Sequence, residues 1–164
     1  MRKIILIAVL CFSFIANAQI NSVSLQASGL TCSMCSNAIS KALKSLDFVW
    51  KVDPDIKTYS FEISFKPDSK IDFELIRKKV ESAGFFVSAF YVSLSLDSIP
   101  VSSGVPFVIQ DMTFLFVKEN YRVPFGNGKV RILDKGYVPL EEYKRNKYQV
   151  QSSQVYHVAL VANQ

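Results

Sequence analysis

The chain has few of the residues on which most active sites depend. Its 164 residues include three cysteines and a single histidine. One histidine without an evident partner excludes a Ser/His/Asp arrangement, and no glycine-rich phosphate loop follows a predicted strand. Glu141 and Glu142 are adjacent, so a helix would point them in different directions. We therefore expect that the protein is not an enzyme.

Blocks of one charge are also missing. The formal net charge is +5, and the lysines and arginines are scattered along the chain. Nucleic-acid-binding surfaces need clustered cations, so we expect no nucleic-acid partner. Beyond residue 18 no apolar run reaches the roughly 20 residues that a transmembrane helix needs. The mature chain is therefore expected to be soluble, monomeric and without a transmembrane segment.

The one long apolar run lies at the N-terminus. Arg2 and Lys3 precede an apolar run over residues 4–15, and Ala16-Asn17-Ala18 follows it. A basic start, a short apolar core and a small-x-small site are typical of a secretory signal peptide. We predict a signal peptide over 1–18 with cleavage after Ala18. The mature protein is then secreted or periplasmic.

Apolar periodicity predicts alternating strands and helices in the first half. Alternation over 22–28, 48–52, 59–65 and 85–96 is typical of strands. Two helices are expected between them. The first has the apolar stripe Ala38, Ile39, Ala42, Leu43 and Leu46. The second begins after Asp72, a suitable N-cap, and ends at Gly84.

This order, βαββαβ, predicts a ferredoxin-like α+β sandwich with two helices on a four-stranded antiparallel sheet. We assign it to residues 20–96. Residues 97–106 are rich in serine and proline and are predicted to be a linker. Residues 107–164 contain further strand patterns and a short helix near Pro139, and are predicted to form a small β-rich module of unknown family. A module of this size is marginal alone, so we expect it to pack against the first half.

Two cysteines remain in the mature chain, in the sequence GLTCSMC at residues 29–35. Cys32 is placed in the loop after the first strand and Cys35 at the start of the first helix. The positive end of a helix dipole favours thiolate over thiol there. Two thiolates suit soft Cu(I), whereas zinc usually takes four ligands. The pair therefore predicts a soft-metal site.

GLTCSMC on this pattern resembles the heavy-metal-associated domain family, whose motif is Gly-Met-Thr-Cys-x-x-Cys. The resemblance covers about residues 20–95, and ESAGFFV at 81–87 is similar to the family's entry into its last strand. It implies that Cys32 and Cys35 are the metal ligands. Leu30 stands where the family has a buried methionine, and Phe85 near its frequent tyrosine or lysine. Thr31 resembles the copper-type members rather than the zinc-type members.

The sequence thus favours an exported protein that captures Cu(I) and passes it on by ligand exchange. The expected acceptor is a copper-transporter domain or a cuproenzyme. The same ligands also suit Hg(II) or Zn(II), so a heavy-metal scavenger is an alternative. A candidate third ligand is Met34 or His157; the usual role of a strand histidine is structural.

Two other roles for the cysteine pair stay open. An exported pair can be a structural disulfide, although so small a loop contributes little chain-entropy stabilisation. Cys-x-x-Cys at a helix start also serves thiol-disulfide exchange, but the element order differs from thioredoxin-like folds and no proline is suitably placed. A third possibility is an adaptor whose second half binds a membrane protein.

Overall fold

The computed structural model describes residues 20–30, 33–95, 104–117, 127–145 and 155–161. The predicted signal peptide lies outside these residues, as do Thr31, Cys32 and most of the predicted linker. Of the helices described, none combines the length and apolarity that crossing a bilayer requires.

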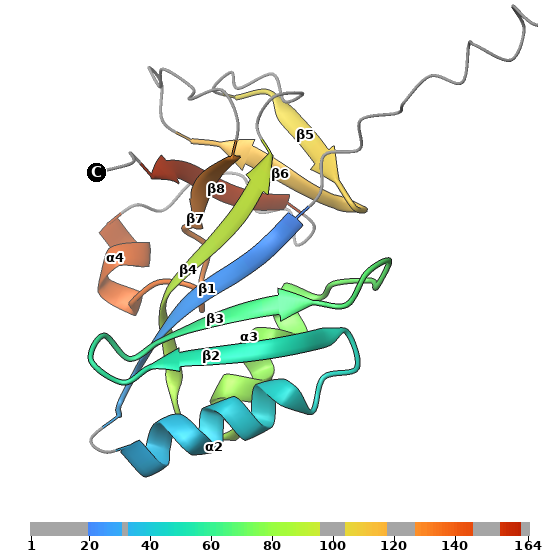
Figure 1. Cartoon of the computed structure of the whole chain (residues 1–164). Coiled ribbons are helices and arrows are strands. Elements are labelled where there is room, and N and C mark those ends of the chain that lie inside the picture. Colours follow the sequence, from blue (N-terminus) through green and yellow to red (C-terminus); the bar gives the residue numbers. More distant parts are fainter. Residues whose placement is uncertain (1–19, 31–32, 96–103, 118–126, 146–154, 162–164) are drawn as a thin grey trace, which may run out of the picture.

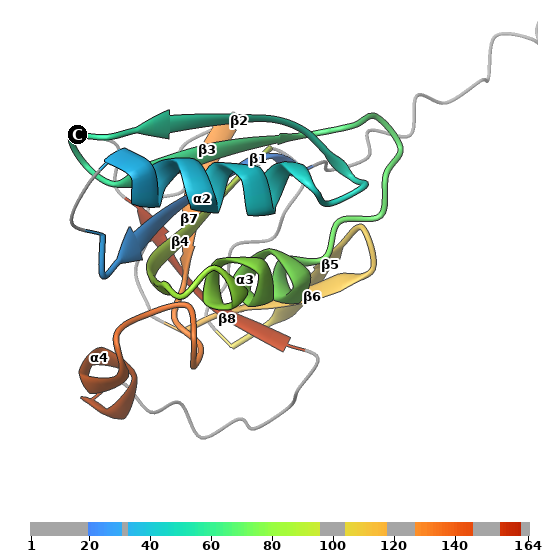
Figure 2. The same cartoon turned by 90° about the horizontal axis from the view of Figure 1, so that it is seen from below.

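The predicted fold of the first half is confirmed. Its elements are β1 (Ile20–Ser28), α2 (Ser33–Lys44), β2 (Val49–Asp55), β3 (Ser60–Phe65), α3 (Phe73–Ser82) and β4 (Phe86–Ser95). The strands lie in the order β2-β3-β1-β4, and every neighbouring pair is antiparallel. Figures 1 and 2 show α2 and α3 side by side against one face of these strands. This is the ferredoxin-like α+β arrangement.

The ends of α3 follow the local signals in the sequence. The Asp72 side chain accepts a hydrogen bond from the Leu75 backbone N–H at 3.0 Å, which satisfies one of the first free amides of the helix. After the helix, Gly84 has a φ of +89°, a left-handed conformation that glycine adopts without a Cβ clash. The predicted start and end of this helix are confirmed.

The buried face of α2 differs from the predicted stripe. The structure buries Ser36, Ile39, Ser40 and Leu43, which recur at helical spacing, and leaves Ala38 exposed. Among the described residues, the buried hydroxyls of Ser36 and Ser40 find no hydrogen-bond partner. The predicted stripe was therefore wrong to include Ala38 and to omit Ser36 and Ser40, because position on the helix outweighed side-chain polarity.

The second half continues the same sheet. Its elements are β5 (Pro106–Ile109), β6 (Met112–Phe116), β7 (Asn127–Ile132), α4 (Leu140–Arg145) and β8 (Val155–Val161). β7 pairs with β4, and the full order is β2-β3-β1-β4-β7-β8-β6-β5. β6 and β8 are parallel, whereas the other pairs are antiparallel. The four predicted strands are thus half of an eight-stranded sheet (Figure 1).

One aromatic cluster joins the two halves of the sheet. The ring centroid of Phe73, on α3, lies 5.2 Å from that of Phe90 on β4. It lies 5.4 Å from that of Tyr156 on β8 and 6.3 Å from that of Phe114 on β6. Tyr137 lies 5.1 Å from Phe90 in an edge-to-face contact. Such pairs add to the stabilisation from burial alone. Helix α3 therefore covers the junction between the halves.

A β-bulge changes the facing of the first residues of β4. Gln26 pairs with Ala89, but the next residue of β1, Ala27, pairs with Val87, so Ser88 is an extra residue. Phe90 is buried and Phe86 is 67% exposed. Strict alternation predicts that Phe86 and Phe90 share a face; the bulge turns Phe86 outward.

Candidate metal centre

The cysteine loop connects the end of β1 to the start of α2. Gly29 follows β1 with a φ of +88°, a left-handed conformation that side chains rarely adopt. Leu30 is partly buried and packs against the hydrophobic core. The left-handed conformation of Gly29 and the core packing of Leu30 therefore define the described start of the loop.

The turn between α3 and β4 lies beside this loop. The Gly84 and Phe85 N–H groups donate to the carbonyls of Glu81 and Val80 at 2.9 and 3.2 Å, which closes the helix. A Cβ built on Gly29 would lie 3.8 Å from Phe85 Cδ1. The aromatic ring of Phe85 therefore lies on the side of Gly29 where a side chain would stand.

Of the motif itself, the structure describes Cys35 and Met34 but not Thr31 or Cys32. Cys35 is half-buried in the first turn of α2, where backbone N–H groups lack partners within the helix. No acidic residue stands in that turn, and Lys41 and Lys44 stand in the last one. The helix dipole therefore favours negative charge at Cys35.

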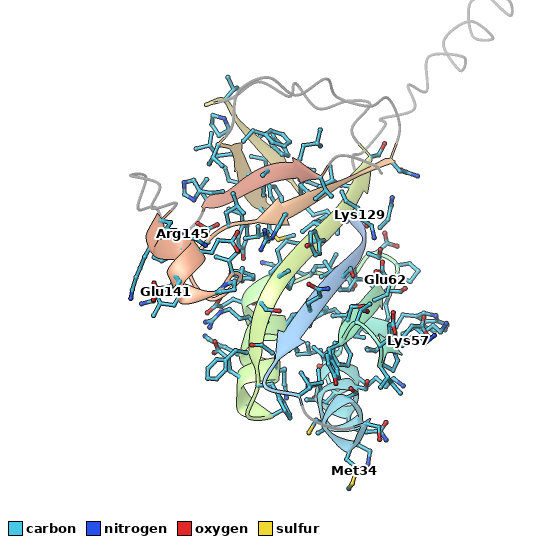
Figure 3. All side chains as sticks on the ribbon, turned by 90° about the vertical axis from the view of Figure 1, so that its left-hand side faces the viewer. Met34, Lys57, Glu62, Lys129, Glu141 and Arg145 are labelled. Atoms are coloured by element: carbon cyan, nitrogen blue, oxygen red, sulfur yellow. The ribbon has the colours of Figure 1, made fainter. Side chains whose placement is uncertain are left out.

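Met34 is 78% exposed and points away from the body of the protein (Figure 3). Its thioether is therefore open to solvent at the same helix end as Cys35.

His157 lies on β8, and its polar partner is Asp134, two residues after the end of β7. Its Nδ1 lies 2.7 Å from Asp134 Oδ1, and its backbone N–H donates to Asp134 Oδ2 at 2.8 Å. His157 is buried, and burial raises the pKa of Asp134 above its usual value. β4 and β7 separate β8 from β1, whose end leads into the cysteine loop. Sequence reasoning missed Asp134, because nothing local links two residues so far apart in the chain.

Among the described residues, no group of three or more histidine, cysteine or acidic side chains is placed to hold a metal ion.

Comparisons with known proteins agree on this part of the chain. The family model of the heavy-metal-associated domain matches residues 24–86, which include both cysteines of the motif. The mercuric transport protein periplasmic component of Pseudomonas fluorescens is 34% identical over 68 residues. That match spans 42% of this chain and 74% of the relative.

Two solved structures resemble the same region. The oxidised MerP of Ralstonia metallidurans CH34 is 31% identical, with 43% of this chain and 94% of that chain covered and a TM-score of 0.38. The yeast copper transporter domain Ccc2a, solved in apo and Cu(I)-loaded states, is 31% identical, with 40% and 88% covered and a TM-score of 0.36.

Proposed function

Because this chain belongs to the heavy-metal-associated domain family, we propose that it is an exported protein that binds a soft metal ion through Cys32 and Cys35 and transfers it by ligand exchange. The observation that carries the proposal is the position of Cys35 in the first turn of α2, after a loop that begins at Gly29 in a left-handed conformation. The mechanism needs an accessible, negatively charged sulfur pair, and this position favours one.

Ligand exchange proceeds through a shared ion. Cys32 and Cys35 hold the ion, an incoming thiolate or thioether adds to form a three-coordinate intermediate, and one cysteine then leaves. The ion is never released to solvent. Partial exposure of Cys35 allows a partner's ligand to approach. The proposed partner is a transporter domain or a cuproenzyme that presents a similar soft site.

Cu(I) is the proposed ion, and Hg(II) is the second candidate. Two thiolates in a near-linear arrangement suit both ions. The family motif with Thr31 before the first cysteine favours copper, whereas the relative from Pseudomonas fluorescens carries a name that refers to mercury. The same relative supports a periplasmic location, which also fits the predicted signal peptide.

The test is a competition titration of reduced mature protein with Cu(I) and, separately, with Hg(II). We expect tight one-to-one binding that a Cys32→Ser/Cys35→Ser variant loses by at least about 1,000-fold, since a site with neither thiolate retains no soft ligand pair. A Met34→Leu variant and a His157→Gln variant test whether either side chain is a third ligand.

Equal affinity in wild type and the double cysteine variant contradicts the proposal. In that case the pair serves thiol-disulfide exchange or a structural disulfide, and a measured reduction potential of the pair distinguishes these two roles. A loss of affinity in Met34→Leu or in His157→Gln identifies that residue as the third ligand.

A further inference from the structure

A cavity of about 830 Å³ begins at Ser28, the last residue of β1, and the proposed metal function does not use it. Its walls come from both halves of the chain: the end of β1, the start of β4 and one side of α3 on the first half, and residues 135–143 on the second. Cavities that hold small organic ligands span about 300–1,000 Å³, and this one falls in that range.

The cavity has an apolar wall that is open to solvent. Phe86 and Leu140 line it and are 67% and 54% exposed. Val87 and Val138 line it deeper and are buried. The β-bulge in β4 turns Phe86 toward this space instead of into the core. Large apolar side chains exposed around a hollow are typical of a binding site.

The charged groups that line the cavity differ in whether they have an ion-pair partner. The Arg77 guanidinium forms ion pairs with Glu74 and Glu81, and Lys78 lies 3.9 Å from Glu74, so these two cations and two carboxylates balance. Lys135 also lines the cavity and is exposed. Within the described part of the chain, no carboxylate lies within ion-pair distance of Lys135. The uncompensated charge at this wall is therefore positive.

We propose that this cavity binds a small amphipathic organic anion, with its apolar body between Phe86 and Leu140 and its carboxylate beside Lys135. A carboxylate completes a charge-assisted hydrogen bond with an ammonium group. A cationic amphiphile would meet Lys135 with like charge, and a small polar anion would leave the apolar wall uncovered. This site is separate from the metal function proposed above.

Full-length mature protein is titrated with octanoate, octylammonium and acetate, and the backbone amides of Ser88, Gly136 and Tyr143 are followed by NMR. Octanoate is expected to shift these amides to saturation. Octylammonium has the same chain with the opposite charge, and acetate has the charge without the chain. Neither is expected to saturate in the same concentration range.

Two pairs of variants locate the site. Lys135→Gln is expected to weaken octanoate binding about three- to fivefold, the size of an exposed ion pair. Its control is Lys129→Gln, because Lys129 is exposed on β7 and lies far from α4 (Figure 3). Leu140→Asn is expected to weaken binding about tenfold through lost apolar contact. Its control is Val108→Asn on β5, which is 67% exposed.

Both controls are expected to bind octanoate like wild type, as is the Cys32→Ser/Cys35→Ser variant, which separates this site from the metal loop. The proposal is overturned by any of three results. These are equal binding of octanoate and octylammonium, equal effects of Lys135→Gln and Lys129→Gln, or saturable shifts confined to residues away from the cavity.

Discussion

Residues 20–95 and residues 104–161 form the two halves of one sheet, but they bury its apolar side chains in different ways. The first region supplies two amphipathic helices of 12 and 10 residues, each with a buried side. In the second, the described residues supply one helix, α4, which has 6 residues and none of them buried. The aromatic side chains of the second region, Phe114 and Tyr156, pack instead beneath Phe73 of α3.

The second region therefore depends on the first for its hydrophobic cover. An element that cannot bury its own apolar face needs a neighbour to do so. A polar contact also joins the two regions, since the Tyr137 hydroxyl donates to Glu74 of α3 at 3.3 Å. We expect the two regions to unfold together, and three experiments test this comparison.

The largest effect is expected from Phe114→Ala. Phe114 is fully buried on β6, and its ring lies 5.5 Å from that of Phe107 and 5.7 Å from that of Tyr156. Removing a buried phenylalanine typically costs about 3–5 kcal/mol of unfolding free energy. Trp50, the single tryptophan, lies on β2 at the opposite edge of the sheet and reports on the first region.

In urea unfolding, the fluorescence transition of Trp50 is expected to move to lower urea together with the exchange of β8 amides. Val108→Ala, at an exposed position of the neighbouring strand β5, serves as the matched control and is expected to change stability by less than about 0.5 kcal/mol. An unchanged Trp50 transition in Phe114→Ala would show that the two regions unfold independently.

A smaller effect is expected from Gly136→Ala in the loop before α4. Gly136 has a φ of +89°, and an added Cβ would lie 2.9 Å from Arg77 Cδ. The left-handed conformation alone costs a side-chain-bearing residue about 1–2 kcal/mol. Arg77 cannot move aside freely, because Glu74 and Glu81 hold its guanidinium.

Gly84→Ala is the matched control, since Gly84 also has a φ of +89° and nothing lies within 4 Å of an added Cβ. Urea unfolding is expected to show a larger loss for Gly136→Ala than for Gly84→Ala. In an Arg77→Ala background the two losses are expected to become equal. Equal losses in the wild-type background would mean that Arg77 does not press on this loop.

The smallest effect is expected from Glu74→Gln and depends on pH. The hydrogen bond with Arg77 holds the pKa of the Glu74 carboxyl below its usual value, and the Tyr137 hydroxyl acts in the same direction. Because the folded pKa is lowered, the ionised carboxylate stabilises the fold above the unfolded pKa of about 4.5. This contribution is lost as the pH falls through the folded pKa.

Wild type is therefore expected to exceed Glu74→Gln in stability by about 0.5–1 kcal/mol near pH 7, the range of partly exposed ion pairs. The difference is expected to shrink when urea unfolding is repeated below pH 4. Glu141→Gln, an exposed carboxylate beside Lys144, is the control for a general charge effect. A difference that stays constant with pH would exclude Glu74 as the source.

Signals carried by a few neighbouring residues were sufficient to predict much of the first region. Asp72 caps α3 and Gly84 ends it, because capping and left-handed turns involve atoms within one helical turn. The βαββαβ order and the GLTCSMC motif were also readable, and the match of residues 24–86 to the family model supports them. The metal ligands themselves stay a prediction, since Cys32 lies outside the described residues.

Other features were not readable, for a different physical reason. The buried face of α2 includes Ser36 and Ser40, because the direction of a helix face is set by what packs on it rather than by side-chain polarity. Asp134 meets His157, and β6 pairs in parallel with β8, only after distant segments have come together. Periodicity within a window carries no information on such pairings.

Phe86 shows most clearly which features the local sequence determines and which the tertiary structure determines. The local pattern specifies a strand there, since alternating apolar residues favour β structure whatever lies nearby. Which way Phe86 faces depends on one extra residue opposite β1, and that register is chosen by the packing of the whole sheet. The sequence alone specifies the strands, the helix ends and the cysteine motif, because these depend on neighbouring residues. The continuous eight-stranded sheet and the cavity that begins at Ser28 arise only where residues 20–95 and 104–161 meet.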